Sequence, residues 1–221
     1  TSLLTTHYGA KPSGTPLGIT WKPQGDDVKR FDYLQFGTVR TVLDTTLYPE
    51  PDLAFVFFRT APTRDEETVA GSWCVLCEDQ LGLAIYKQLS TEWTLIKFEK
   101  GFAKQGVYGR VAKPEMVETG KKGKVVRIIS SDGEPEHNST THHLFGVPGL
   151  REAFTITTDG IEVTRGGEHG PMDATVSREY KFIPSDKDWF DVEVVDNEQP
   201  TRWTYSSATG KYVVAGKPQA K

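Results

Sequence analysis

The sequence predicts an all-β fold: a single domain over residues 1–221, built as an antiparallel sandwich or barrel with long loops and little helix. Short runs rich in β-branched and aromatic residues recur along the chain, and such residues fit a pleated, half-buried surface. Glycine and proline, 21 and 13 of the 221 residues, punctuate these runs. No segment keeps the i, i+3, i+4, i+7 apolar spacing of an amphipathic helix over three turns. Short strands separated by turn signals are typical of sandwiches and barrels.

Each predicted strand is an apolar or alternating run that ends at a turn residue. Two hairpin turns are expected, at Asp159-Gly160, because this dipeptide supports positive φ, and over residues 206–211. A single helical turn is expected over residues 148–154, and the polar stretch 130–149 is the largest expected loop. In chain order, strands are expected at residues 17–22, 31–43, 53–60, 69–77, 81–87, 92–99, 106–112, 124–129, 153–158, 160–165, 175–183, 189–195, 201–207 and 211–216.

Composition and charge exclude several classes of protein. The 30 acidic and 26 basic side chains leave a net charge of −4, which is not the basic footprint of a nucleic-acid-binding protein. No apolar run reaches the length of a membrane span, so no membrane insertion is expected. Neither a phosphate-binding P-loop nor a dinucleotide fingerprint occurs, and no cofactor is expected. Because the chain starts at Thr1 without methionine, we expect either a processed product or, as the domain assignment adopts, a domain excised from a longer protein. The triplet that begins at Asn138 fits a glycosylation acceptor.

Both cysteines, Cys74 and Cys77, lie in the stretch GSWCVLCED with C-x-x-C spacing. Residues three apart in a strand point to opposite faces, so these thiols cannot form a disulfide or hold one metal unless the strand bulges. A redox motif also needs a helix after its first cysteine, and no helical pattern follows. A zinc site would need His137, His142 or His143, and adjacent imidazoles are unusual in tetrahedral sites. The sequence therefore predicts buried structural cysteines and no metal.

Five side chains are candidates for ligand binding. His142 and His143 stand in the polar stretch 130–149. With His137 they could form a catalytic histidine cluster, although no activated nucleophile accompanies them; a passive polar loop and a pH-sensitive contact are the other interpretations. Trp21, Trp189 and Trp203 lie near predicted turns. Exposed aromatic rings beside polar groups serve glycan or protein recognition, and core packing is the alternative for each ring.

The chain resembles the projection (spike) domain of astrovirus-type capsid proteins. The resemblance rests on its start at TSLLTTHYGA, its tail YVVAGKPQAK, the near absence of helix and the Thr/Gly/Pro-rich pattern of strands and turns over the whole length. It implies a non-enzymatic domain on the virion surface that attaches to a host receptor, protein or glycan, and bears antibody epitopes. It also implies a homodimer, since weak single sites gain avidity when displayed in many copies. No family binding residue can be transferred to a position in this chain.

A carbohydrate-active enzyme is the alternative, either a β-jelly-roll polysaccharide lyase or a hydrolase; a lectin-like domain without viral origin would share the binding mechanism. Residues 98–108 are faintly similar to the Lys/Gln/Tyr strand of alginate-lyase-like folds. Such chemistry needs a base and a group that neutralises the substrate carboxylate. The candidates are Lys104, Gln105, Tyr108 and His142.

Overall fold

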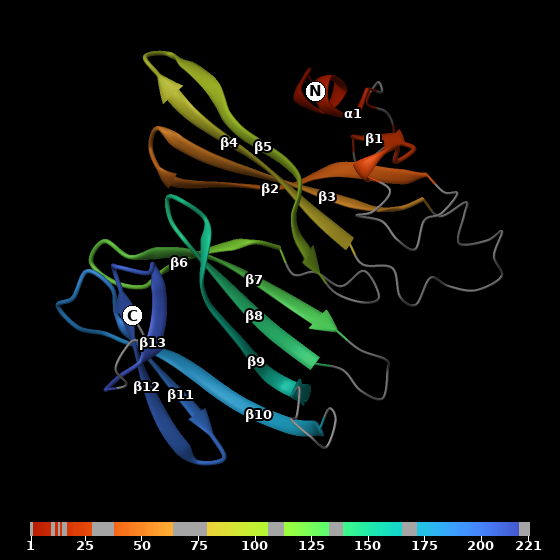
Figure 1. Ribbon diagram of the computed structural model, residues 1–221. Coiled ribbons are helices and arrows are strands. Elements are labelled where there is room, and N and C mark those ends of the chain that lie inside the picture. The colour runs from red at the N-terminus through yellow and green to blue at the C-terminus, as the bar shows by residue number, and fades with distance from the viewer. Residues whose placement is uncertain are drawn as a thin grey trace. The chain divides into compact units, whose positions relative to one another are not determined.

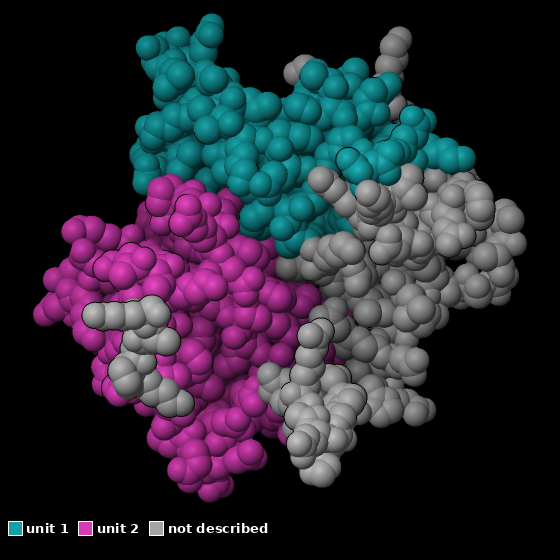
Figure 2. All heavy atoms as spheres, viewed as in Figure 1, with its two compact units in different colours: residues 1–113 teal, residues 114–221 magenta. Residues whose placement is uncertain are grey.

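The fold is described from a computed structural model, which describes residues 2–9, 12, 14, 17–27, 38–63, 79–105, 113–132, 139–164 and 172–216. Within these residues the chain is almost entirely β and forms two antiparallel sheets, which confirms the predicted fold class. Contacts divide the chain into two compact units, Thr1–Lys113 and Pro114–Lys221 (Figure 2). The assignment of residues 1–221 to one domain stays a prediction.

The first unit contains a five-stranded sheet in which every strand pairs with its neighbour in the chain (Figure 1). The β2–β3 and β4–β5 connections are two-residue hairpins, which suits the turn-rich sequence. Its strands are β1 (Gly18–Trp21), β2 (Val39–Glu50), β3 (Leu53–Pro62), β4 (Asp79–Leu89) and β5 (Glu92–Gln105).

One face of this sheet is partly covered by the short helix α1 (Ser2–Tyr8). A helix of this length is not stable by itself, so its packing holds it in place. Leu4 and Tyr8, four residues apart, lie on one side of the helix. Gly9 has φ of 71° and donates its N–H to the Thr5 carbonyl at 2.9 Å, which ends the helix. The buried cluster beneath α1 comprises Leu4, Tyr8, Ile19, Trp21, Val39, Phe58 and Ala84.

The second unit contains an eight-stranded sheet, again with sequential antiparallel pairing (Figure 1). All eight strands follow in chain order, so this sheet too is a meander. Its strands are β6 (Glu115–Glu118), β7 (Lys124–Asp132), β8 (Ser139–Gly146), β9 (Arg151–Thr164), β10 (Met172–Ile183), β11 (Asp191–Asp196), β12 (Gln199–Ser206) and β13 (Lys211–Val214).

The eight-stranded sheet curls into a half-barrel around an aromatic core. Phe154 on β9 contacts Trp203 on β12 and Tyr212 on β13, with ring centroids 5.3 and 5.7 Å apart. Two and three strands separate β9 from these partners in the sheet order, so the contacts require the sheet to bend back on itself. We call the face that carries this core the inner face. It also buries Val125, Leu144, Ala153, Ile156, Val192 and Val194.

Two loops hold the curl closed by pairing their backbones. Residues 119–123, between β6 and β7, lie against residues 187–190, which precede β11. The N–H of Gly123 donates to the Asp188 carbonyl at 2.7 Å, and the N–H of Phe190 donates to the Thr119 carbonyl at 2.5 Å. Lys122 adds an ion pair with Asp188 at 3.0 Å.

Glycine is needed where these two backbones meet. A methyl group on Gly120 would overlap the Asp188 carbonyl and the backbone of Trp189. On Gly123 it would lie 2.9 Å from the Trp189 ring, tighter than ordinary van der Waals contact. Close backbone approach is a common reason for glycine in β structure.

The predicted 130–149 loop is wrong over its central part, because residues 139–146 form β8 in the middle of the sheet. Its side chains are polar for a central strand, yet threonine and aromatic rings favour strands. His142 and His143 are consequently strand residues. Their side chains point to opposite faces, so they do not act together as a loop cluster.

The hairpin turn predicted at Asp159-Gly160 is also wrong. β9 continues through both residues, which pair with Ser177 and Val176 of β10. Gly160 has φ of 110°, so its positive φ serves a kink inside a central strand rather than a turn. The hairpin expected over residues 206–211 is confirmed between β12 and β13.

The helix of the structure lies at a different place from the one that the sequence predicts. The helical turn expected over residues 148–154 is wrong, because β9 begins at Arg151, whereas α1 is a helix that was not predicted. Much of α1 is threonine and serine, which give no clear helical pattern. The expected strands at 69–77 and 106–112, with Cys74 and Cys77, lie outside the described residues, as do His137 and Asn138.

We expect Gly120→Ala to lower the free energy of unfolding by roughly 1–3 kcal/mol, because the added methyl group overlaps the opposing backbone. Gly149→Ala is the matched control, since a methyl group there meets no atom within 4 Å. The control should stay within about 0.5 kcal/mol of the original chain. Urea denaturation of the three proteins measures both effects. Equal midpoints for all three would contradict the role given to Gly120.

Candidate functional site

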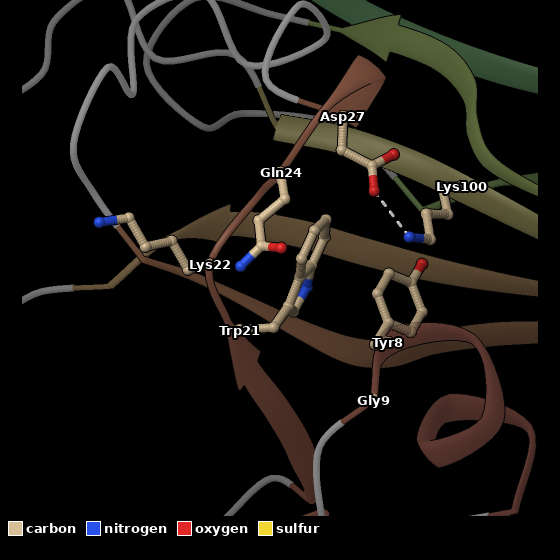
Figure 3. A pocket seen from close by; sticks show the side chains of 7 residues that line it. All are labelled: Tyr8, Gly9, Trp21, Lys22, Gln24, Asp27 and Lys100. Carbon is tan, nitrogen blue, oxygen red and sulfur yellow. Dashed lines mark hydrogen bonds and ion pairs between the residues drawn. The ribbon is translucent and has the colours of Figure 1, made fainter.

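An open cleft of about 430 Å³ lies in the first unit, where α1, β1 and β5 meet (Figure 3). Tyr8 ends α1, Trp21 ends β1 and Lys100 comes from β5. The segment that follows β1 supplies the remaining wall. The lining residues are Tyr8, Gly9, Trp21, Lys22, Gln24, Asp27 and Lys100.

The ammonium group of Lys100 contacts both an acid and two aromatic rings of the cleft wall. It lies 2.7 Å from Asp27 Oδ2, 5.2 Å from the centroid of the Tyr8 ring and 5.0 Å from that of Trp21. A cation over an aromatic ring gains about 0.5–2 kcal/mol, depending on how far it is desolvated. The side chains of Lys100 and Asp27 are 26% and 20% exposed, so both remain accessible from the cleft.

The aromatic wall is anchored from below by a buried hydrogen-bond chain. Trp21 Nε1 donates to Thr41 Oγ1 at 2.9 Å, and that hydroxyl also lies 2.7 Å from Thr60 Oγ1. Thr41 and Thr60 are fully buried on β2 and β3. Tyr8 packs against Trp21 with ring centroids 5.0 Å apart. Both rings therefore occupy fixed positions.

This arrangement suits a polyhydroxylated ligand. Asp27 offers acceptors and Lys100 offers donors side by side, which is the pattern that adjacent sugar hydroxyls require. The exposed Gln24 amide can serve as either, and the rings of Tyr8 and Trp21, each 8% exposed, add a narrow apolar edge. Lys100 and Asp27 cancel each other's formal charge, and the Lys22 side chain points away from this pair (Figure 3), so the centre of the pair favours a neutral ligand over an ion.

A second polar cluster lies on the inner face of the half-barrel. The Tyr180 hydroxyl lies 2.9 Å from His142 Nδ1 and accepts from Arg127 Nη1 at 3.3 Å. Arg127 also forms an ion pair with Glu115. Burial and the neighbouring Arg127 charge lower the pKa of His142, although Glu115 opposes this. His143 points the other way, with Nε2 3.3 Å from Ser130 Oγ.

The three candidate tryptophans have different surroundings. Trp21 borders the cleft but is only 8% exposed and belongs to the buried cluster beneath α1, so core packing holds its ring. Trp189 stacks on Tyr205, with centroids 4.0 Å apart and planes 8° from parallel. Trp203 packs edge-on against Phe154 in the aromatic core. Packing accounts for the positions of Trp189 and Trp203, and a binding role for either stays a prediction.

The lyase candidates are divided between the two units and the residues outside the described part of the chain, so the enzyme alternative stays a prediction. The backbones of Lys104 and Gln105 belong to β5 of the first unit, whereas His142 belongs to the second, and Tyr108 lies outside the described residues. Among the described residues, no three His, Asp or Glu side chains are arranged to hold a metal ion.

Tyr8, Gln24, Asp27 and Lys100 were not singled out as site residues from the sequence. One signal was present: Trp21 is followed within six residues by Gln24 and Asp27. Lys100 is 73 residues from Asp27 along the chain, and only the fold brings them together.

No protein-family model, curated protein or solved structure matches this chain. No helix in the described residues is long and apolar enough to cross a membrane.

We expect Thr41→Val to lower the free energy of unfolding by about 1–3 kcal/mol, because it leaves two buried polar groups without the hydroxyl that they contact. Thr94→Val on the exposed part of β5 is the control and should change stability by at most about 0.5 kcal/mol. Chemical denaturation compares the two variants with the original chain. If Thr41→Val were neutral, the Trp21–Thr41–Thr60 chain would not stabilise the cleft wall.

The lowered pKa of His142 predicts how stability changes with pH. The ordinary pKa of histidine is 6.5. Below this pH the imidazole of His142 binds a proton more readily in the unfolded chain than in the folded chain, so acid favours unfolding. We expect the original chain to lose more stability than His142→Gln between about pH 7.5 and about pH 5.5. Thermal melts at both pH values measure this difference. The control is His143→Gln, on the opposite face, which should retain the pH dependence that His142 contributes. If the control lost that dependence, it could not be assigned to His142.

Proposed function

We propose that this chain is a non-enzymatic attachment module, carried on a virion surface as a capsid spike domain, and that it binds a glycan of a host receptor. The observation that carries the proposal is the cleft in which the Lys100–Asp27 ion pair lies over Tyr8 and Trp21. Fixed aromatic rings next to paired donors and acceptors are typical of sugar-binding sites. The resemblance to astrovirus-type spikes supports the proposed location on a virion surface.

The size and charge of the cleft indicate the kind of glycan. A volume of about 430 Å³ falls at the small end of the range for ligand pockets, which suits one or two sugar residues. The Lys100–Asp27 pair cancels its own charge, which favours neutral sugars beside it. Such a site binds weakly, and a homodimer displayed in many copies would raise the overall affinity through avidity. Antibodies against the cleft surface would then block attachment.

We expect Lys100→Met to weaken binding to immobilised neutral glycans by about tenfold or more, because a charged hydrogen-bond donor contributes on this scale. Methionine retains much of the apolar stem that packs against the rings. Lys87→Met is the matched control, since Lys87 also forms a 2.7 Å ion pair, with Asp52, on the same sheet. Binding of the fluorescently labelled chain to a glycan panel is the measurement.

Circular dichroism and thermal melts of both variants show whether they remain folded. A folded Lys100→Met chain that binds every glycan as the original does would refute the cleft as the binding site. Equal loss in both variants would show that general surface charge, rather than the cleft, determines attachment.

A further inference from the structure

The second polar cluster belongs to one end of the half-barrel's inner face. Arg127, His142 and Tyr180 each stand two positions from a residue of the aromatic and aliphatic core on the same strand: Val125, Leu144 and Phe182. Because side chains of a strand alternate, these three polar groups share the inner face with the core. Glu115 on β6 pairs with Arg127 in the sheet register and joins them.

The guanidinium group of Arg127 is held in a defined orientation. Its Nε and Nη2 atoms lie 2.6 and 2.5 Å from Glu115 Oε1, and its Nη1 atom donates to the Tyr180 hydroxyl at 3.3 Å. The Tyr180 hydroxyl is in turn 2.9 Å from His142 Nδ1. Three strands besides β7 therefore fix this cation, which needs little ordering before it binds another group.

Glu115 occupies the place that a ligand carboxylate would take. Arginine presents a planar fork that matches a carboxylate, which makes such pairs specific as well as strong. Glu115 is 48% exposed, and it lies on the four-residue strand β6 at the edge of the sheet. Half-exposed ion pairs contribute little to stability, so exchange of Glu115 for another carboxylate is energetically inexpensive.

We propose that Arg127, His142 and Tyr180 form a second binding site, which takes the carboxylate of an acidic sugar, and that Glu115 occupies this site when no ligand is bound. The Arg127 fork binds the carboxylate. The Tyr180 hydroxyl and the His142 ring nitrogens, next to the fork, hydrogen-bond the sugar hydroxyls beside it. The site lies in the second unit and differs from the first unit's cleft in its cation, which is the planar fork of an arginine rather than the ammonium group of a lysine.

Titration of the full chain with D-glucuronate tests this site, with chemical shifts of the Arg127, His142 and Tyr180 side chains as the readout. We expect saturable shifts with glucuronate and none with D-glucose. Glu115→Gln removes the competing charge, so half-saturation should fall to roughly a third of the original concentration. Arg127→Lys retains the positive charge but lacks the planar fork, so it should raise the half-saturation concentration about fivefold.

Glu193→Gln is the matched control, because Glu193 forms a similar 2.7 Å ion pair with Lys181 in the same unit. It should leave half-saturation unchanged. Equal shifts with glucose and glucuronate would overturn the proposal. So would a Glu115→Gln chain that titrates as the original does. Because both glutamates are partly exposed, neither substitution threatens the fold.

Discussion

An open antiparallel sheet with an apolar face must cover that face, and both units are organised by this constraint. The first unit places α1 over part of its sheet, so that Ile19 and Val39 are fully buried. The second unit covers its core by curling, and two loops paired at Gly120 hold the curl. Polar groups lie at the boundary of each buried core. Tyr8 and Lys100 lie at the end of α1, and Arg127 lies at one end of the core of the half-barrel. The location of each site therefore follows from how its sheet hides apolar surface.

Most of the strands could be predicted from sequence because alternating, β-branched runs between turn residues are a local signal. The errors occurred where tertiary pairing overrides that signal. β8 is polar enough to suggest a loop, yet it lies between β7 and β9, which satisfy its backbone. Asp159-Gly160 suggests a turn, yet two neighbouring strands hold it extended. α1 depends on packing rather than on helix propensity, so no local pattern could reveal it.

The sites were less predictable than the strands, since each joins residues distant in sequence. Trp21 could be proposed because an aromatic residue beside a turn is visible in the chain. Its partner Lys100 could not, because lysines on strands usually face solvent. The sequence suggests a cluster of His142 with His143. Side chains alternate along β8, so these two rings lie on opposite faces and cannot form that cluster. Its actual partners, Arg127 and Tyr180, come from other strands, and only the register of the sheet relates them.

The two sites differ in what a ligand must do to the ion pair that it meets. Lys100 is held by Asp27 and by two aromatic rings from separate elements, so a sugar can add its hydroxyls to an intact pair. An unrestrained lysine would lose up to about 2 kcal/mol of side-chain entropy on binding, and much of this loss has already occurred on folding. Arg127 is paired instead with a half-exposed glutamate on an edge strand, and a ligand carboxylate must replace that partner. Addition preserves the charge balance of the first site, whereas replacement releases Glu115 to solvent. For this reason a neutral ligand suits the cleft, and only a ligand with its own negative charge can compensate Arg127.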